Sequence, residues 1–353
     1  MKHSLKIGVV LILALFICLH YSLSLAKNYD CKSIGFDAGL KGVEEFMIQN
    51  VAEEHYRESQ DCIMEGYKEG INYANAEKAY KNKDYSKALK LFLVNAQKGY
   101  MAAQAKVGEL YFNGMGTEQN YQEAFKWNRL AADQGNADAC FFLGLSYRNG
   151  TGTEKDAERA IEAFRKTVER DSKRANAWAY LALCYKEKGD YGHALESINR
   201  ALAISPENRD FMQVQAASYL LQGDTKNAKN SYERLLTELK SDIGKEKTAA
   251  KYSKASWYAL LTAHFTDAER YANDGLALDA KATELHAYIG HAYLLQNSKL
   301  EALAVYKKYV GQDADQAALR NKLNEDFSLL KKQYPEKVSV IEWAENKLQL
   351  AGK

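Results

Sequence analysis

Proline is almost absent from this sequence, with 2 among 353 residues. Proline removes a backbone donor and clashes with the preceding helical turn, so its scarcity leaves long helices uninterrupted. Apolar residues make up 46% of the chain and charged residues 27%, proportions typical of a folded protein with a sizeable core. The composition therefore argues against long disordered linkers.

Long apolar runs are also missing, except at the N-terminus. Two lysines precede an apolar run from Ile7 to about Leu19, and the small residues of Ser24-Leu25-Ala26 follow. This order is typical of a secretory signal peptide. We expect cleavage of residues 1–26 after Ala26 and a periplasmic or secreted protein.

An uncleaved anchor is the alternative. Residues 7–26 number 20, which is about enough to span a bilayer, and would hold the protein in the inner membrane. No later apolar run is long enough to form a membrane helix. We therefore expect no membrane span after cleavage.

Neither sign of charge predominates, since the chain contains 48 basic and 46 acidic residues. Cleavage would remove Lys2 and Lys6 and no acid, so the 48 basic residues would fall to 46 and balance the acids. A neutral chain has no general electrostatic attraction to nucleic acid or anionic lipid. We expect no nucleic-acid partner.

The residue patterns of common catalytic sites are missing as well. The sequence contains no Gly-x-Ser-x-Gly motif, no phosphate-binding loop motif and no cysteine pair with zinc-binding spacing. His286 and His291 are five residues apart on one expected helix, which puts them on different faces and is wrong for a shared metal. We expect no catalytic residue, no cofactor and no metal site.

What the sequence does contain is an alanine that recurs in similar contexts. Successive members are separated by 36, 36, 34, 34, 40 and 34 residues, a period typical of helical repeats. Most units consist of a first helix, a short turn and a second helix that carries the alanine. The 40-residue step contains a polar insertion, LKSDIGKEKTAAKY, which leaves the local helix register open. The recurring alanines are Ala88, Ala124, Ala160, Ala194, Ala228, Ala268 and Ala302.

The unit around Ala194 shows the pattern most clearly. Leu181 and Ala182 lie on one face of its first helix, Gly189 ends that helix, and Pro206 follows where the second helix must stop. Ala182 and Ala194 are small because the two helices approach closely at these positions. The unit resembles a tetratricopeptide repeat.

Two earlier units have a longer turn. The distance from the small first-helix residue to the recurring alanine is 16 residues in the pairs Gly108–Ala124 and Gly144–Ala160, but 12 residues from Ala182 to Ala194. The additional residues belong to the loops NGMGTEQN and NGTGTEKD. These units resemble the Sel-one-like repeat, a relative of the tetratricopeptide repeat.

The glycines of these two loops could belong to a phosphate site or to a wide turn. A phosphate site requires a strand before the loop, and neither loop follows a strand pattern. Glycine also permits left-handed backbone angles in a turn. We therefore interpret the loops as turns between helices.

The resemblance implies an all-α fold, a right-handed superhelical solenoid of helix-turn-helix repeats. We expect Sel-one-like repeats over residues 75–172 and tetratricopeptide-like repeats over residues 173–315. Residues 27–74 should form a separate helical segment. Residues 316–353 should form two helices that close the apolar face of the last repeat, as the ends of solenoids require.

The segments that begin at Cys31 and Cys62 have similar residue patterns. Each cysteine is followed by glycines at four-residue steps, Gly35 and Gly39 or Gly66 and Gly70, and small residues at that spacing allow close helix contact. In an oxidising compartment Cys31 and Cys62 are the best candidates for a disulfide. Buried thiols or pairing between chains are the alternatives.

The two cysteines of the repeats, Cys140 and Cys184, occupy different repeat positions. A disulfide framework that repeats from unit to unit would place its cysteines at equivalent positions. Small apolar thiols also pack well in a core. We expect both residues to be core residues.

The resemblance also implies a binding surface, because specific first-helix positions line the concave groove of tetratricopeptide repeats. The mixture of acids, amides and apolar residues at these positions suits an extended peptide, and we expect polar members such as Asn176, Asp210 and His291 to be exposed. The candidate groove residues are Glu109, Phe141, Leu145, Asn176, Ala179, Leu183, Asp210, Gln213, Glu284 and His291.

These observations favour an exported, non-catalytic scaffold or adaptor that binds a protein or peptide partner. One alternative is a cell-envelope hydrolase, since cysteine-rich relatives of the Sel-one-like repeat are linked to β-lactam hydrolysis. Those relatives carry a regular cysteine pair in each repeat, and this chain does not. A nitrocefin assay distinguishes the two. The other alternative is an envelope assembly factor that keeps residues 1–26 as its anchor.

Overall fold

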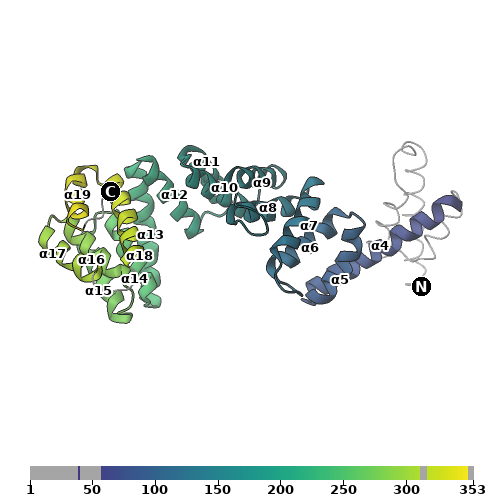
Figure 1. The fold of residues 1–353 in the computed structure, drawn as a ribbon, viewed down its shortest axis with the longest axis horizontal. Helices are drawn as coiled ribbons and strands as arrows, with labels where there is room; N and C mark the ends of the chain where they lie inside the picture. The colour runs from purple at the N-terminus through teal and green to yellow at the C-terminus, as the bar shows by residue number, and fades with distance from the viewer. Residues whose placement is uncertain (1–38, 40–56, 311–315, 349–353) are drawn as a thin grey trace, which may run out of the picture. The chain divides into compact units, whose positions relative to one another are not determined.

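The computed structural model describes residues 57–310 and 316–348, together with Gly39. Within these ranges every regular element is a helix and none is a strand, so the predicted all-α fold is confirmed. The helices belong to two compact units, divided between Asp156 and Ala157 (Figure 1). We call them the first and second unit.

The first unit is a series of antiparallel helices in which each described helix packs against the next (Figure 1). Tyrosine and phenylalanine rings fill the space between α4, α5 and α6, with Phe92 fully buried at their centre. Its helices are α4 (Arg57–Lys81), α5 (Tyr85–Gln97), α6 (Met101–Asn113), α7 (Tyr121–Asp133) and α8 (Ala137–Asn149).

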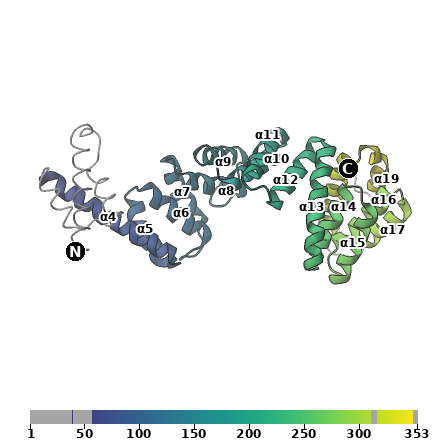
Figure 2. The same ribbon diagram turned by 180° about the vertical axis from the view of Figure 1, so that it is seen from behind.

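The second unit continues the same helix-turn-helix pattern, and Figure 2 shows α13, α14 and α15 side by side. Two helices and a short 3-10 turn follow its last repeat. Its elements are α9 (Ala157–Arg170), α10 (Ala175–Lys188), α11 (Tyr191–Ile204), α12 (Arg209–Gln222), α13 (Thr225–Lys245), α14 (Ala249–Leu261), α15 (Phe265–Leu278), α16 (Glu284–Leu295), α17 (Lys299–Val310), α18 (Gln316–Gln333), η1 (Pro335–Lys337) and α19 (Val338–Lys347).

The recurring alanines are the most uniform feature of the core. All seven lie on second helices and have an exposed fraction of 0%. A methyl group is the largest side chain that such close helix contacts accept. The prediction that this alanine marks the helix contact of each repeat is confirmed.

The long loops of the first unit explain why two glycines occur in each. Gly114 and Gly150 end α6 and α8 in the left-handed conformation, with φ of 65° and 72°. Gly116 and Gly152 are also left-handed, and a Cβ on either would overlap the backbone of Tyr85 or Tyr121, at the start of α5 or α7. The turn interpretation is confirmed, and the second glycine of each loop additionally permits close backbone approach.

The polar insertion lengthens α13 instead of forming a loop. Helix α13 contains 21 residues and ends at Lys245, and Thr248 then caps α14 by accepting a hydrogen bond from the backbone N–H of Lys251. The Tyr252 side chain is buried in the same core as the last repeats. The helix register that the sequence leaves open is therefore defined by the Thr248 cap.

The turn after α14 lacks the glycine that ends α10 and α12. Ala263 there adopts a left-handed φ of 67°, which costs about 1 to 2 kcal/mol for an L-residue. We expect Ala263→Gly to stabilise the second unit by about 0.5 to 1 kcal/mol, because strain relief exceeds the added unfolded-state entropy. Urea denaturation measures the change.

The matched control for Ala263→Gly is Ala304→Gly, at an exposed position inside α17. There glycine should cost about 1 kcal/mol. The argument from backbone strain fails if both substitutions destabilise the unit equally.

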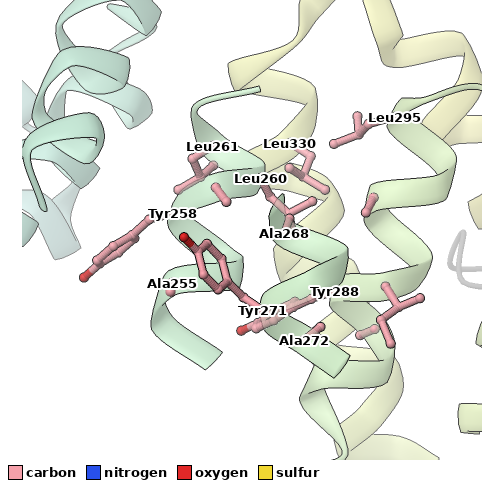
Figure 3. Close-up of a cluster of buried hydrophobic side chains, with 14 of the residues drawn as sticks. Ala255, Tyr258, Leu260, Leu261, Ala268, Tyr271, Ala272, Tyr288, Leu295 and Leu330 are labelled. Carbon is pink, nitrogen blue, oxygen red and sulfur yellow. The ribbon is translucent and has the colours of Figure 1, made fainter. Parts of the chain in front are cut away.

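The last two helices, α18 and α19, pack against different parts of the second unit. Helix α19 packs against α16 and α17 and buries Ile341 and Ala344. Helix α18 instead extends back along earlier repeats and contacts α12. Figure 3 shows Leu330 of α18 beside Leu260 and Leu261 at the end of α14.

Near the N-terminus the close helix contact that the spaced glycines predict is confirmed for one pair, Gly39 and Gly70. A Cβ on Gly39 would lie 2.9 Å from Cα of Gly70, so the two backbones approach closely. The signal peptide, Gly35 and Cys31 lie outside the described residues, so the Cys31–Cys62 disulfide stays a prediction. Cys140 and Cys184 are both buried, as predicted for core residues.

Candidate binding surface of the first helices

The predicted groove residue of α6 already has partners within the first unit. The Glu109 carboxylate accepts hydrogen bonds from the Tyr80 hydroxyl at 2.7 Å and from Lys106 Nζ at 2.9 Å. Lys106 Nζ also lies 4.6 Å from the centre of the Tyr80 ring. Burial, followed by the hydrogen bond to Glu109, raises the pKa of Tyr80, so its hydroxyl remains a donor at neutral pH. This cluster stabilises the packing of α4 on α6.

The apolar groove candidates of the first unit belong mainly to its core. The Phe141 side chain is buried, and its ring centre lies 5.9 Å from that of Phe142. Leu145 is half-buried one helical turn further along α8. Little of either side chain is available to a partner.

In the second unit the polar candidates of α10 and α12 are exposed. Asn176 lies in the first turns of α10, and Asp210 and Gln213 occupy the same part of α12. Ala179 is buried and Leu183 is half-buried, which leaves the amide and carboxylate groups as the accessible chemistry. Such groups can pair with the backbone and basic side chains of a bound chain.

Tyr258 on α14 interacts electrostatically with the Asp210 carboxylate. Burial first and the Asp210 carboxylate second raise the pKa of Tyr258 to about 12. The hydroxyl is therefore protonated at neutral pH and can donate a hydrogen bond. Figure 3 shows the Tyr258 ring directed away from the other labelled side chains.

The two candidate groove residues on α16, Glu284 and His291, differ in how far they are exposed. Glu284 is half-buried at the start of the helix, whereas His291 has an exposed fraction of 0%. His291 Nδ1 lies 2.7 Å from the Tyr306 hydroxyl, and Nε2 lies 3.4 Å from Oδ2 of Asp326 on α18. The prediction that His291 is exposed is wrong, because α18 covers it.

The side chains of α18 that cover the first helices were not predicted as site residues. Leu323, Phe327 and Leu330 are fully buried at helical spacing, and Asp326 is buried beside them. Lys322 Nζ lies 2.5 Å from Oδ1 of Asp326 and 5.5 Å from the centre of the Trp257 ring. The spacing of the apolar residues shows an amphipathic helix in the sequence, but it does not show which surface that helix covers.

No group of three or more potential metal ligands occurs in the part of the chain that the structure describes. Within the same part, no helix is long and apolar enough to cross a membrane. The exposed polar positions of α10 and α12 are the predicted residues that remain most accessible.

The family comparisons agree with the repeat pattern. The Sel1 repeat profile matches residues 70–100, 102–136 and 137–167, and the tetratricopeptide repeat profile matches residues 175–208. The chain therefore contains three Sel1 repeats and one tetratricopeptide repeat. No curated protein matches its sequence.

Several solved structures are similar to this repeat protein. A Sel1 repeat protein from Oxalobacter formigenes is 24% identical, over 78% of this chain and 99% of the other, with a TM-score of 0.37. A protective antigen with an SLR fold from uropathogenic Escherichia coli strains is 16% identical, over 90% and 79%, with a TM-score of 0.47. A tetratricopeptide repeat protein from Parabacteroides merdae is 14% identical, over 75% and 98%, with a TM-score of 0.46.

Sel1 and tetratricopeptide repeats are typical of protein-interaction scaffolds, and chains built of them are typically non-catalytic. The repeats generally mediate binding of proteins or peptides.

Proposed function

We propose that this repeat protein is an exported, non-catalytic scaffold that binds a protein partner through the exposed first-helix residues of α10 and α12. The observation that carries the proposal is the accessibility of Asn176 and Asp210, at equivalent places on the successive first helices α10 and α12, together with Gln213 one turn further along α12. Their side chains combine amide donors and acceptors with a carboxylate. An extended segment with a free backbone and a basic side chain complements this set.

Export is part of the same proposal. It is supported by the lysines, apolar run and small residues of segment 1–26. N-terminal sequencing of the protein purified from its native cells tests it, with Lys27 as the expected first residue. An intact Met1 would favour the membrane-anchored alternative.

Cross-linking in native cells tests the binding surface directly. A photoreactive amino acid at Asn176 or Gln213 should capture a discrete partner, which mass spectrometry then identifies. The same residue at Glu196, which is exposed on the second helix α11, serves as the control. Capture from Glu196 but not from the two first-helix positions would contradict the proposal.

Once a partner is identified, Asn176→Ala and Gln213→Ala should each weaken its binding by about fivefold, because interface truncations that matter cost at least about 1 kcal/mol. The stability of the second unit should change by less than about 0.5 kcal/mol, as is usual for exposed sites. Isothermal titration calorimetry and thermal denaturation measure the two quantities. Glu196→Ala, as control, should change neither.

A further inference from the structure

The outward faces of the second helices α5 and α7 carry an apolar residue where the other repeats carry a charge. Val94 follows the recurring alanine of α5 by six residues, and Leu130 follows that of α7 by six residues. The same position is exposed in all seven second helices, and in the other five it is charged. Those five residues are Lys166, Arg200, Arg234, Asp274 and Lys308. The position therefore faces solvent in every repeat, but only α5 and α7 place an apolar side chain there.

The two apolar side chains are well exposed and lie on neighbouring helices. Their exposed fractions are 46% for Val94 and 39% for Leu130. Gln134, at the end of α7, donates a hydrogen bond from Nε2 to the carbonyl oxygen of Gly99, after the end of α5, at 3.1 Å. The loop that precedes α7 approaches the start of α5 at Gly116. Because the two helices are joined near both ends, their equivalent outward positions form one surface.

Basic side chains accompany the two apolar residues. Lys90 precedes Val94 by four residues, and Lys126 precedes Leu130 by four residues, so each lysine lies one turn away on the same side of its helix. Helix α5 contains no acidic residue. The exposed cations of the two helices are Lys87, Lys90, Lys126 and Arg129.

The acids of α7 balance only part of this charge. Oε1 of Glu123 lies 3.5 Å from Lys126 Nζ, and Asp133 is exposed at the end of the helix. Because α5 adds two lysines and no acid, the outward surface of α5 and α7 keeps a net positive charge.

A surface of this composition is complementary to an anionic bilayer. Lysine and arginine are attracted to the phosphate headgroups, and apolar side chains beside them enter the boundary between headgroups and acyl chains. Protein partners are instead anchored mostly by tryptophan, tyrosine and arginine, and leucine and valine are under-represented among such anchors. The whole chain is close to neutral, so the attraction is confined to this surface.

We propose that the outward surface of α5 and α7 binds reversibly to an anionic phospholipid membrane. Lys87, Lys90 and Arg129 contact the headgroups, and Val94 and Leu130 enter the boundary below them. Both alternatives for residues 7–26, a signal peptide or an anchor, bring the chain to a membrane. The inference does not rest on the proposed partner of α10 and α12, which belong to the second unit.

Co-sedimentation with vesicles tests the proposal. The chain is used from Lys27, its expected first residue after export, so that the apolar N-terminal segment does not contribute. Vesicles of equimolar phosphatidylglycerol and phosphatidylcholine should bind it at low salt, and vesicles of phosphatidylcholine alone should not. Higher salt should weaken the binding, because exposed charges are screened. Equal binding to both kinds of vesicle, or binding to neither, overturns the proposal.

Two double variants separate the basic from the apolar contribution. Lys90→Gln/Arg129→Gln should weaken binding to the anionic vesicles by at least about tenfold, since each basic residue near such a surface contributes about fivefold. Val94→Ser/Leu130→Ser should weaken it by about tenfold, because the apolar contact with the lipid is lost. Circular dichroism checks that both variants are folded. Binding at the wild-type level in either folded variant contradicts the proposal.

The matched control is Arg200→Gln/Ile204→Ser on α11 of the second unit. Ile204 has an exposed fraction of 40%, close to that of Leu130, and Arg200 occupies the repeat position of Val94. This variant should bind the anionic vesicles as the wild type does. A loss equal to that of the first-unit variants would mean that the surface of α5 and α7 has no special role, which overturns the proposal.

A soluble polyanion distinguishes a membrane from other anionic partners. Inorganic polyphosphate carries phosphate groups but has no apolar part. It should bind the wild-type chain more weakly than the anionic vesicles do, and Val94→Ser/Leu130→Ser should leave its binding unchanged. Tighter binding of polyphosphate than of the vesicles would identify a soluble polyanion as the partner and refute the proposal. Absence of vesicle binding with intact cross-linking from Asn176 would refute this inference alone.

Discussion

Alanine in place of Gly116 is expected to destabilise the first unit by about 2 to 5 kcal/mol, the sum of left-handed strain and steric overlap. Gly116 has a φ of 74°, and a Cβ there would overlap the backbone carbonyl carbon of Tyr85. Backbone atoms at a helix start cannot move aside as a side chain can. The loop would have to separate from α5.

Gly99→Ala is the matched control within the same unit. Gly99 has a φ of 94°, but a Cβ on it would meet nothing within 4 Å. This substitution should therefore cost only the conformational strain, about 1 to 2 kcal/mol. Urea denaturation of both variants separates the two contributions. Equal losses would mean that the close approach of Gly116 to Tyr85 contributes nothing.

The second large effect is expected for Asp326→Ala, which should weaken the docking of α18 by about 3 to 5 kcal/mol. The Asp326 carboxylate is fully buried, accepts a hydrogen bond from Lys322 and faces His291. Truncation would leave the imidazole of His291 without this partner in an interior that excludes water. Hydrogen exchange of the α18 backbone measures the loss.

Asp326→Asn tests whether charge or shape is responsible. The amide keeps the size of the side chain and one acceptor oxygen, so the loss should be smaller, about 1 to 2 kcal/mol. Glu325→Ala, on the exposed face of α18, should cost less than about 0.5 kcal/mol. The role given to the buried carboxylate is incorrect if all three variants behave alike.

The repeats could be predicted from the sequence because their determinants are local. Each recurring alanine contacts the helix that directly precedes it in the chain, so a period of 34 to 36 residues is enough to identify the pair. The loop glycines were predictable as turn residues for the same reason. Their second role, contact with the start of a helix about 30 residues earlier, has no local signal.

The exposure of the candidate residues was only partly predictable. Asn176, Asp210 and Gln213 are exposed because nothing in the described part of the chain covers their helices at these points. His291 lies at the repeat position of Leu183 and is buried by a helix that follows it by some 30 residues and belongs to no repeat. Aligning one repeat with another predicts where a residue lies within its repeat. It does not predict which residues are covered by segments that follow the repeats.

The hydrogen bond between Lys332 and Leu221 joins residues that are 111 positions apart. During synthesis, α12 leaves the ribosome well before α18 does, and at 5 to 20 residues per second the delay is about 6 to 22 seconds. Each new chain therefore passes through a period in which the surface of α12, α14 and α16 that α18 later covers is still uncovered. In that interval other amphipathic segments can contact this surface.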